Sequence, residues 1–538
     1  MQVDVNTAWV LPPSPVTGED HLGVRAVSEA IYTELVPCVT NVTDRVRSYA
    51  FYPWFTWKFG QQQPTAGYDE FVRLFRRAEC LFTLVGARHE LITKESPEMH
   101  GGGLVGRSKL LGPLRELDKR VFQLSDFAEP SLRTESAKSY FMAELGGFDQ
   151  YYGGTLQTLD IMGGGRKGGI KVTPTRGVRL ARAFDSEVPG NAFWNAILGD
   201  TVSAKLLDEL VPFCPCHLER RTAEIDAILD VLLNRDRLAG APDMRDALRL
   251  VCDFLVAQKH PVDDRDRLIW QFRESAYGGL LPTGAWNDTA LSKWAAYHRH
   301  ELLSVTLQSL FCGVFRAVEK ANDAGQLPAL QSSHQVARWF MERCGAELSG
   351  LELARPARDF FADAATRLPP RGDIQDEAHE LRQAERLIAE KEIGPAISRA
   401  VTLLASLSAR LADEPPYPGF SREDSYFKDY PLNLRSLRSL SLGTWQSLTV
   451  KDWITWLVTH WSVGHHLRVA FRKLHSQGID TFRIRPSELG LLPVQNIEVV
   501  YGNPRLEQTL RALRDLGLID AEHRLTAAGQ VLRGELHG

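Results

Sequence analysis

Two cysteines and a histidine stand together at residues 214–217, which read Cys-Pro-Cys-His. Thiolate and imidazole groups are common zinc ligands in proteins, so this segment has the composition of half a zinc site. A complete site needs a second pair of ligands, usually another C-x-x-C or H-x-x-x-H, and the sequence supplies only Cys252 with His260 as a substitute. We therefore expect a buried turn between two helices at 214–217, with no metal and no other cofactor.

A glycine run at residues 101–108, Gly-Gly-Gly-Leu-Val-Gly-Arg-Ser, has the spacing of a phosphate-binding P-loop. Arg107 stands where that motif requires a lysine. A P-loop also follows a buried apolar strand, whereas the preceding residues 91–100 are largely polar and include Pro97. We therefore expect a glycine loop that binds no nucleotide.

A second glycine-rich segment, residues 163–171, carries Arg166, Lys167 and Lys171, and Arg176 follows shortly after it. A cationic backbone without bulky side chains can approach a phosphate backbone closely and bind it independently of sequence. The alternative is a solvent-exposed linker whose charge is incidental. The first interpretation makes this loop a candidate nucleic-acid contact.

A basic helix is expected within residues 456–478, where Arg468, Arg472 and His475 are spaced at i, i+4 and i+7 and so share one face. Together with Lys473, this face has the charge and spacing to lie along a DNA backbone. The alternative is an amphipathic helix whose apolar residues pack inward while its charges are merely solvated.

A third candidate contact surface lies near the N-terminus. Arg45 and Arg47 are followed by seven aromatic residues within 49–59. Such a density of rings either anchors a core or forms a stacking surface, and a core is the commoner case. As a surface, the two arginines with Tyr49 and Tyr52 would act beside the basic loop.

Motifs for catalysis are missing from the sequence. It has neither the G-x-S-x-G turn of serine hydrolases nor the H-E-x-x-H helix of zinc peptidases, and none of its cysteines has a recognisable nucleophile environment. We expect no catalytic residues. An enzyme whose active-site residues are dispersed along the chain is the alternative.

The elements that carry these residues are mostly helical, and the fold class we predict is mainly α. Residues 1–177 are expected to form a mixed α/β domain with glycine-rich loops. Residues 178–413 show repeated i, i+3, i+4, i+7 spacing and predict a helical bundle around a long helix at 291–321. A proline-rich linker is expected at 414–433, and a further helical segment at 434–538.

The C-terminal segment is expected to end in a winged helix-turn-helix. Residues 504–515 predict a helix closed by Gly517, followed by two short strands around the turn at 521–523 and by a final helix. The stretch LRDLGLIDAEHRLTAAGQVL resembles the ends of bacterial winged-helix modules. That fold serves both DNA binding and protein docking.

Composition limits the classes of partner. The chain has 538 residues, of which 44% are hydrophobic and 24% charged, as in globular proteins. Its net charge of -4, from 63 basic and 67 acidic residues, excludes a global cationic field, so any nucleic-acid contact must be local. Seven scattered cysteines, no signal peptide and no long apolar run predict a reduced, cytoplasmic protein without a membrane span.

Five segments together resemble a group of bacterial proteins encoded among phage-defence genes. They are NVTDRVRSYAFYPWF, AELGGFDQYYGGTLQTLDIM, FCPCHLERR, WAAYHRHELLSVTLQSLF and HHLRVAFRKLH. The resemblance implies a component of a multi-protein antiviral defence system and brings no functional residues with it. We expect a non-catalytic component that binds duplex DNA or acts as a scaffold. The alternatives are a nucleic-acid-processing nuclease with a dispersed site and a docking subunit for a partner ATPase or nuclease.

Overall fold

The structure is a computed structural model of all 538 residues. It describes the chain from residue 20 onward except for several internal stretches. The residues outside the description are 1–19, 117–120, 129–142, 165–168, 259–263, 279–288, 349, 371–376, 415, 419 and 421–429.

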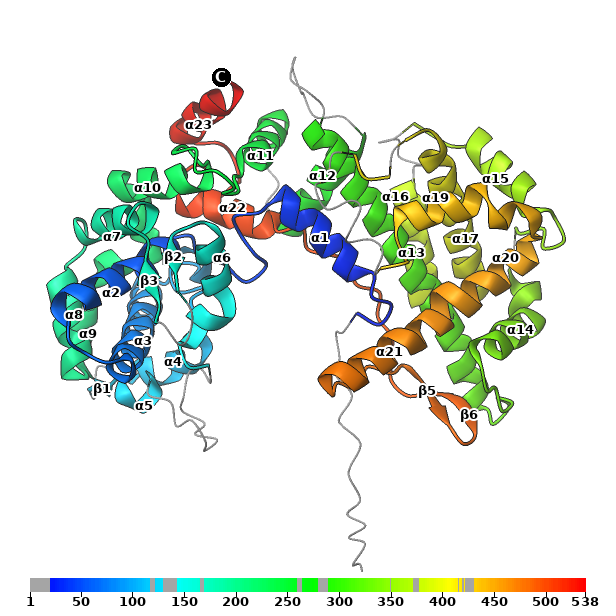
Figure 1. Ribbon diagram of the computed structural model, residues 1–538, viewed down its shortest axis with the longest axis horizontal. Helices are drawn as coiled ribbons and strands as arrows, with labels where there is room; N and C mark the ends of the chain where they lie inside the picture. The colour runs from blue at the N-terminus through cyan, green and yellow to red at the C-terminus, as the bar shows by residue number, and fades with distance from the viewer. Residues whose placement is uncertain are drawn as a thin grey trace, which may run out of the picture. The chain divides into compact units, whose positions relative to one another are not determined.

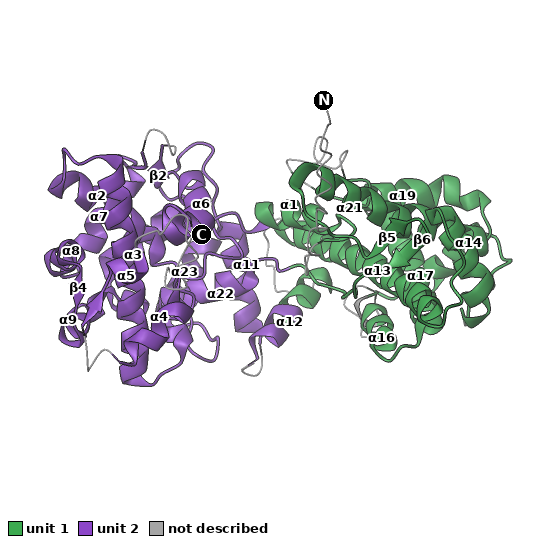
Figure 2. Cartoon of the chain, turned by 90° about the horizontal axis from the view of Figure 1, so that it is seen from below, with its two compact units in different colours: residues 1–34, 271–280, 284–502 green, residues 35–270, 281–283, 503–538 purple. Residues whose placement is uncertain are grey.

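The fold is mainly α, as predicted, with only short strands among the described residues (Figure 1). Two compact units divide the chain, and each unit gathers segments that are far apart in sequence (Figure 2). Unit 1 comprises residues 1–34, 271–280 and 284–502, and unit 2 comprises residues 35–270, 281–283 and 503–538. The contiguous domains predicted from the sequence therefore differ from these units, and the predicted linker at 414–433 falls inside unit 1 rather than between the units.

Unit 2 is built around aromatic side chains. Its helices are α2 (Ser48–Gln62), α3 (Tyr68–Thr93), α4 (Arg107–Leu114), α5 (Ser125–Ala128), α6 (Gly153–Thr158), α7 (Arg176–Asp185), α8 (Gly190–Gly199), α9 (Ala204–Glu209), α10 (Thr222–Leu232), α11 (Arg245–Ala257), α22 (Leu506–Asp515) and α23 (Ala527–His537). Helix α2 is apolar on all faces, and such a helix must be buried on all sides. Its Phe51 stacks on Phe82 of α3 with ring centroids 4.2 Å apart.

The burial of α2 decides between the two interpretations of the aromatic segment. Tyr49 and Tyr52 are 1% and 2% exposed, and both pack against other aromatic rings. The prediction that this segment forms a contact surface is wrong. Six of the seven rings are buried in the core of unit 2, and Trp57 alone among them is partly exposed.

The N-terminal domain is predicted to be mixed α/β, and the strands that the structure describes there belong to two short antiparallel pairs. Strand β1 (Phe122–Gln123) pairs with β4 (Thr201–Val202), and β2 (Met162–Gly163) pairs with β3 (Lys171–Val172). Short 3-10 segments η1 (Pro97–Met99), η3 (Val211–Phe213) and η4 (Pro215–Arg220) and the π-helical segment η2 (Phe148–Tyr152) complete unit 2. None of the four strands exceeds two residues, so helix packing rather than a sheet holds this unit.

The C-terminal segment packs into unit 2, with helix α22, a hairpin closed by the single bridge between Ile519 and Leu525, and helix α23. The apolar residues of this segment are buried: Leu510, Leu513, Leu516, Leu518 and Ile519. The predicted order of helix, tight turn and helix is thus present, while the winged-helix assignment stays a prediction.

Unit 1 is a helical bundle. Its helices are α1 (Arg25–Leu35), α13 (Thr289–Asp323), α14 (Ser333–Cys344), α15 (Ala357–Thr366), α16 (Glu377–Ala389), α17 (Ile393–Asp413), α19 (Leu434–Leu442), α20 (Val450–Leu457) and α21 (Val463–Gln477). Strands β5 (Ile484–Ser487) and β6 (Gly490–Pro493) form a hairpin, and η5 (Gly345–Glu347), η7 (Thr444–Ser447) and the π segment η8 (Val458–Ser462) join the helices. Helix α12 (Arg265–Gly278) crosses the division between the units at residue 271.

Helix α13 is the long central helix that the sequence predicts, and it packs against α16 and α17. Among the described helices it alone is long and apolar enough to cross a membrane. Its most apolar window is 94% buried inside the fold, as in the core helix of a bundle.

Buried histidines tie other segments to this bundle. In α21, His466 is fully buried; its Nδ1 donates to the carbonyl oxygen of His21 (3.2 Å) and its Nε2 accepts from the backbone N–H of Arg483 (3.0 Å). Burial lowers the pKa of His466 to about 3, so the ring is neutral at pH 7.

Candidate metal centre

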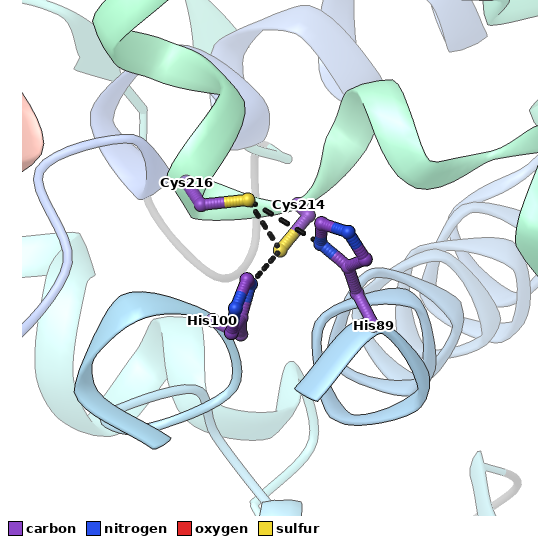
Figure 3. A group of neighbouring side chains, drawn as sticks. All are labelled: His89, His100, Cys214 and Cys216. Carbon is purple, nitrogen blue, oxygen red and sulfur yellow. Dashed lines mark hydrogen bonds between the residues drawn. The ribbon is translucent and has the colours of Figure 1, made fainter. Parts of the chain in front are cut away.

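Four side chains from three separate stretches of unit 2 converge on one point (Figure 3). They are His89, His100, Cys214 and Cys216, and their ligand atoms all lie within 4.8 Å of one another. The Sγ of Cys214 lies 3.5 Å from Nδ1 of His100, and the Sγ of Cys216 lies 3.3 Å from Nδ1 of His89. The two sulfur atoms are 3.4 Å apart.

These separations are close to those of a tetrahedral zinc site. With Zn–S bonds of about 2.3 Å and Zn–N bonds of about 2.0–2.1 Å, tetrahedral angles place two sulfurs about 3.8 Å apart and a sulfur and a nitrogen about 3.5 Å apart. The sulfur–nitrogen distances agree within about 0.2 Å, and the sulfur–sulfur distance is about 0.4 Å shorter. The other pairs of ligand atoms lie within 4.8 Å, so an ion at the centre would draw these atoms closer together.

The two cysteines come from the junction of two 3-10 segments. Cys214 ends η3 and precedes Pro215, which starts η4 with its ring at a position that needs no N–H donor. The backbone N–H of His217 donates to the carbonyl of Cys214 (3.0 Å) and closes the turn. The turn brings both sulfurs to the same side, facing α3.

The two histidines come from either side of the end of α3. His89 lies in the last turns of this helix, and His100 follows η1 and directly precedes the glycine run. Glycine is needed after His100 because the loop lies directly on α3 and on itself. A Cβ at Gly101 would lie 3.1 Å from Ala87, and one at Gly102 would lie 2.6 Å from the carbonyl oxygen of Pro97. The run that has P-loop spacing in the sequence therefore serves close packing that positions His100.

A carboxylate orients the ring of His100. Its Nε2 lies 2.7 Å from Oε2 of Glu95 and 3.1 Å from Oγ1 of Thr93, while its Nδ1 faces Cys214. Histidine ligands of metals usually donate their other ring N–H to such a carboxylate, which fixes the tautomer and the ring orientation. His100 has this arrangement with its Nδ1 free to act as a ligand.

The thiols of the cluster have shifted pKa values. Burial opposes ionisation of Cys214, but the thiol of Cys216 and the rings of His100 and His89 together hold its pKa well below the usual value. The neighbouring Cys214 and burial raise the pKa of Cys216. Burial raises the pKa of Cys38 and Cys80, which lie outside the cluster. Cys214 is therefore the thiol poised to act as a thiolate, the form that binds metals.

Arg47 holds the cysteine turn from behind. Its guanidinium is fully buried in a bidentate pair with Glu224, with Nε 3.1 Å from Oε1 and Nη2 3.2 Å from Oε2. Its Nη1 donates to the carbonyl of Cys214. Burial raises the pKa of Glu224 despite the attraction of Arg47. The prediction that Arg47 contacts nucleic acid is wrong, because its charge is used inside the fold.

Arg45 holds the other loop in the same way. Its Nη1 donates to the carbonyls of Glu98 (2.6 Å) and Gly102 (3.1 Å), on either side of His100, and its Nη2 pairs with Asp515 of α22 at 2.8 Å. The arginine is 3% exposed. The prediction that Arg45 contacts nucleic acid is therefore also wrong, because this side chain is buried inside the fold.

The residues of the predicted basic loop differ in how far they are exposed to solvent. Arg176 is 3% exposed, with Nε 2.8 Å from Asp236 and Nη1 2.9 Å from the carbonyl of Leu159, so its prediction as a nucleic-acid contact is wrong. Lys171 is exposed on β3. Arg166 and Lys167 lie outside the described residues.

The predicted basic helix is α21. Arg468 and Arg472 are exposed on it, as is Phe471 between them at 51%. Lys473 is half-buried, and its Nζ donates to the carbonyl of Asp20 at 2.9 Å. The exposed part of the predicted contact face therefore consists of the two arginines with His475.

The second ligand pair is what the sequence reasoning missed. The partners of Cys214 and Cys216 lie 114 and 127 residues away and are themselves separated by a turn, so they match no H-x-x-x-H spacing. The expectation that no second pair accompanies the cysteines is overturned by this geometry. One usable feature was the His-Gly-Gly-Gly sequence at 100–103, since a histidine in a tightly packed loop is held in place.

No protein-family profile, curated protein or solved structure matches this chain.

Proposed function

We propose that the protein binds one Zn²⁺ through His89, His100, Cys214 and Cys216, and that the ion is structural. The observation that carries the proposal is the convergence of two thiols and two imidazoles within 4.8 Å. A mixed set of two sulfur and two nitrogen ligands selects zinc over magnesium or calcium, which require oxygen ligands. Four protein ligands fill the coordination sphere, whereas catalytic zinc keeps one position open for water or substrate.

The role that follows is that of a non-catalytic, zinc-stabilised scaffolding component. A closed metal site supplies folding free energy rather than a reaction. The burial of three of the predicted phosphate contacts, Arg45, Arg47 and Arg176, favours a scaffold over a DNA-coating protein. The setting we propose, a cytoplasmic multi-protein antiviral system with a partner ATPase or nuclease, rests on the sequence resemblance alone.

Metal content tests the zinc proposal. Protein purified without added metal should carry one zinc per chain, and the double variant Cys214→Ser with Cys216→Ser should carry none. The matched control replaces Cys252 and Cys344, which lie outside the cluster, with alanine and should keep its zinc. Zinc-free wild-type protein, or equal zinc in the double serine variant, would overturn the proposal.

Duplex DNA binding through α21 is the second candidate function. The observation that favours it is the exposure of Arg468 and Arg472 one turn apart on the same helix. Two phosphate contacts would contribute about 2 to the slope of log affinity against log salt concentration.

Fluorescence anisotropy with a labelled duplex tests this candidate. Replacing Arg468 and Arg472 with alanine should weaken binding and lower the salt slope by about 2. The control replaces Arg358 and Arg367, which are 66% and 81% exposed elsewhere in unit 1, with the same change in net charge. Equal affinity of the two double variants excludes this helix as the contact. Divalent-metal-dependent cleavage of the duplex by the protein alone would instead support the nuclease alternative.

A further inference from the structure

The histidine loop and the cysteine turn both contact helix α22, which begins at Leu506, almost 300 residues after the cysteine turn and about 400 after the histidine loop. Among helices and strands, α22 packs chiefly against η4, the segment that begins directly after Cys214. A Cβ at Gly517, just beyond the end of α22, would lie 3.3 Å from the side chain of Glu219 in η4. The helix therefore rests on the cysteine turn.

The histidine loop contacts the same helix through charged groups. Arg45 bonds the carbonyls of Glu98 and Gly102 and also pairs with Asp515 in the last turn of α22. Nη1 of Arg514 lies 3.5 Å from Oε2 of Glu98. Asp515 is buried, and its Oδ2 accepts the backbone N–H of Val46 at 3.3 Å. The end of α22 is thus bonded to the loop that presents His100.

The neighbouring helix α23 is held by different contacts. It packs against α11, and both Arg533 (2.7 Å) and His537 (3.0 Å) reach Oδ1 of Asp253 on that helix. Glu535 pairs with Arg235, with Nε 2.9 Å from Oε1. None of these groups belongs to the ligand loops, so α22 and α23 differ in what holds them although they adjoin in sequence.

We infer that zinc at this site controls the docking of α22. The inference rests on the proposed zinc site. With zinc bound, the histidine loop and the cysteine turn are joined through one ion, and their joint surface holds α22 at both its packing face and its last turn. Without zinc the two loops separate, α22 loosens, and its buried residues Leu506, Leu510 and Leu513 become accessible. Helix α23 stays packed on α11, so the metal controls the docking of α22 alone; we call this arrangement the latch.

Hydrogen exchange of the full chain, followed by mass spectrometry, tests this inference. Zinc removal by a chelator should raise exchange at least about tenfold in peptides covering 95–104, 211–221 and 506–516, because each amide protected by the latch opens locally. Peptides of α23 and of α13 in unit 1 should keep their protection. Metal content measured on the same samples shows whether zinc was present and whether it left.

The outcomes separate this inference from the zinc proposal. No zinc in the starting protein contradicts the proposed function. Zinc that leaves without any change in α22 contradicts the latch and leaves the zinc site standing. A uniform rise in all of unit 2 also contradicts it, because the effect would then be general unfolding.

A variant that spares all four ligands gives an independent test. Asp515→Asn weakens the bond between α22 and Arg45 and should raise exchange in α22 several-fold while the zinc content stays at one per chain. The control Glu535→Gln weakens the corresponding pair of α23 and should leave α22 unchanged. Unchanged exchange in α22 of the Asp515 variant would overturn the inference.

Discussion

The ion pair behind the cysteine turn allows a quantitative test of the fold around the site. Replacing Arg47 with methionine keeps most of the volume but removes both hydrogen bonds to Glu224, which is itself fully buried. Breaking a buried pair by removing one partner costs about 3–5 kcal/mol, because the remaining charge is left without compensation. We expect Arg47→Met to lower the free energy of unfolding of unit 2 by this amount and to loosen the retention of zinc.

Removing both partners should cost far less. In the double variant Arg47→Met with Glu224→Met neither charge of this pair remains, and the carbonyl of Cys214 still accepts the N–H of His217 at 3.0 Å. The expected loss is about 1 kcal/mol, since apolar pairs often replace buried ion pairs with little change in stability. The control Arg73→Ala breaks a half-exposed pair with Glu70 and should cost less than about 1 kcal/mol.

Urea unfolding measures these differences, with the loss of protected amides in α2 and α3 reporting on unit 2. The expected order of destabilisation is the single Arg47 variant, then the double variant, then the Arg73 control. If Arg47→Met costs no more than Arg73→Ala, the argument from the buried pair is refuted.

Three further predictions concern the metal site and the bundle. Glu95→Gln removes the carboxylate that orients His100 and should weaken zinc affinity about 10–100-fold in a chelator competition, and unchanged affinity would contradict that role. Gly102→Ala places a Cβ 2.6 Å from the carbonyl oxygen of Pro97 and should destabilise unit 2 by about 1–3 kcal/mol in urea unfolding, whereas a neutral effect would show that the loop yields. His466 has a pKa of about 3 in the folded state and about 6.5 in the unfolded state, so the unfolded chain binds the proton first as the pH falls. Unit 1 should therefore lose stability between pH 6.5 and 3, by up to about 1.4 kcal/mol per pH unit from this residue. His466→Gln should reduce this dependence of stability on pH in urea titrations from pH 7 to 5, and an equal dependence would contradict the argument.

Helix positions followed from the sequence because hydrophobic periodicity is local. The pattern at 291–321 predicted α13, which runs over Thr289–Asp323, and the helix expected at 504–515 is α22, over Leu506–Asp515. The division into units did not follow, because each unit joins segments from opposite parts of the chain. Periodicity marks which face of a helix is buried and carries no information about the partner that covers it.

The site could not be predicted from the sequence because it depends on contacts between segments that are far apart in the chain. Arginine is a residue type typical of surface contacts, but Arg45 and Arg47 are buried because they pair with Asp515 and Glu224, which lie 470 and 177 residues away. The local sequence around an arginine does not show whether its side chain is buried or exposed. The candidate ligands could be found in part, since the two cysteines are separated by a single residue, but the histidines that complete the set are contributed by a helix end and a loop more than 100 residues upstream.

X-ray absorption at the zinc edge of the purified protein tests the central claim most directly, because it reports the type and distance of the atoms around the ion. The Cys214, Cys216, His89 and His100 site predicts two sulfur neighbours at about 2.3 Å and two nitrogen neighbours at about 2.0–2.1 Å. A shell without sulfur, or protein that carries no zinc at all, would contradict the claim.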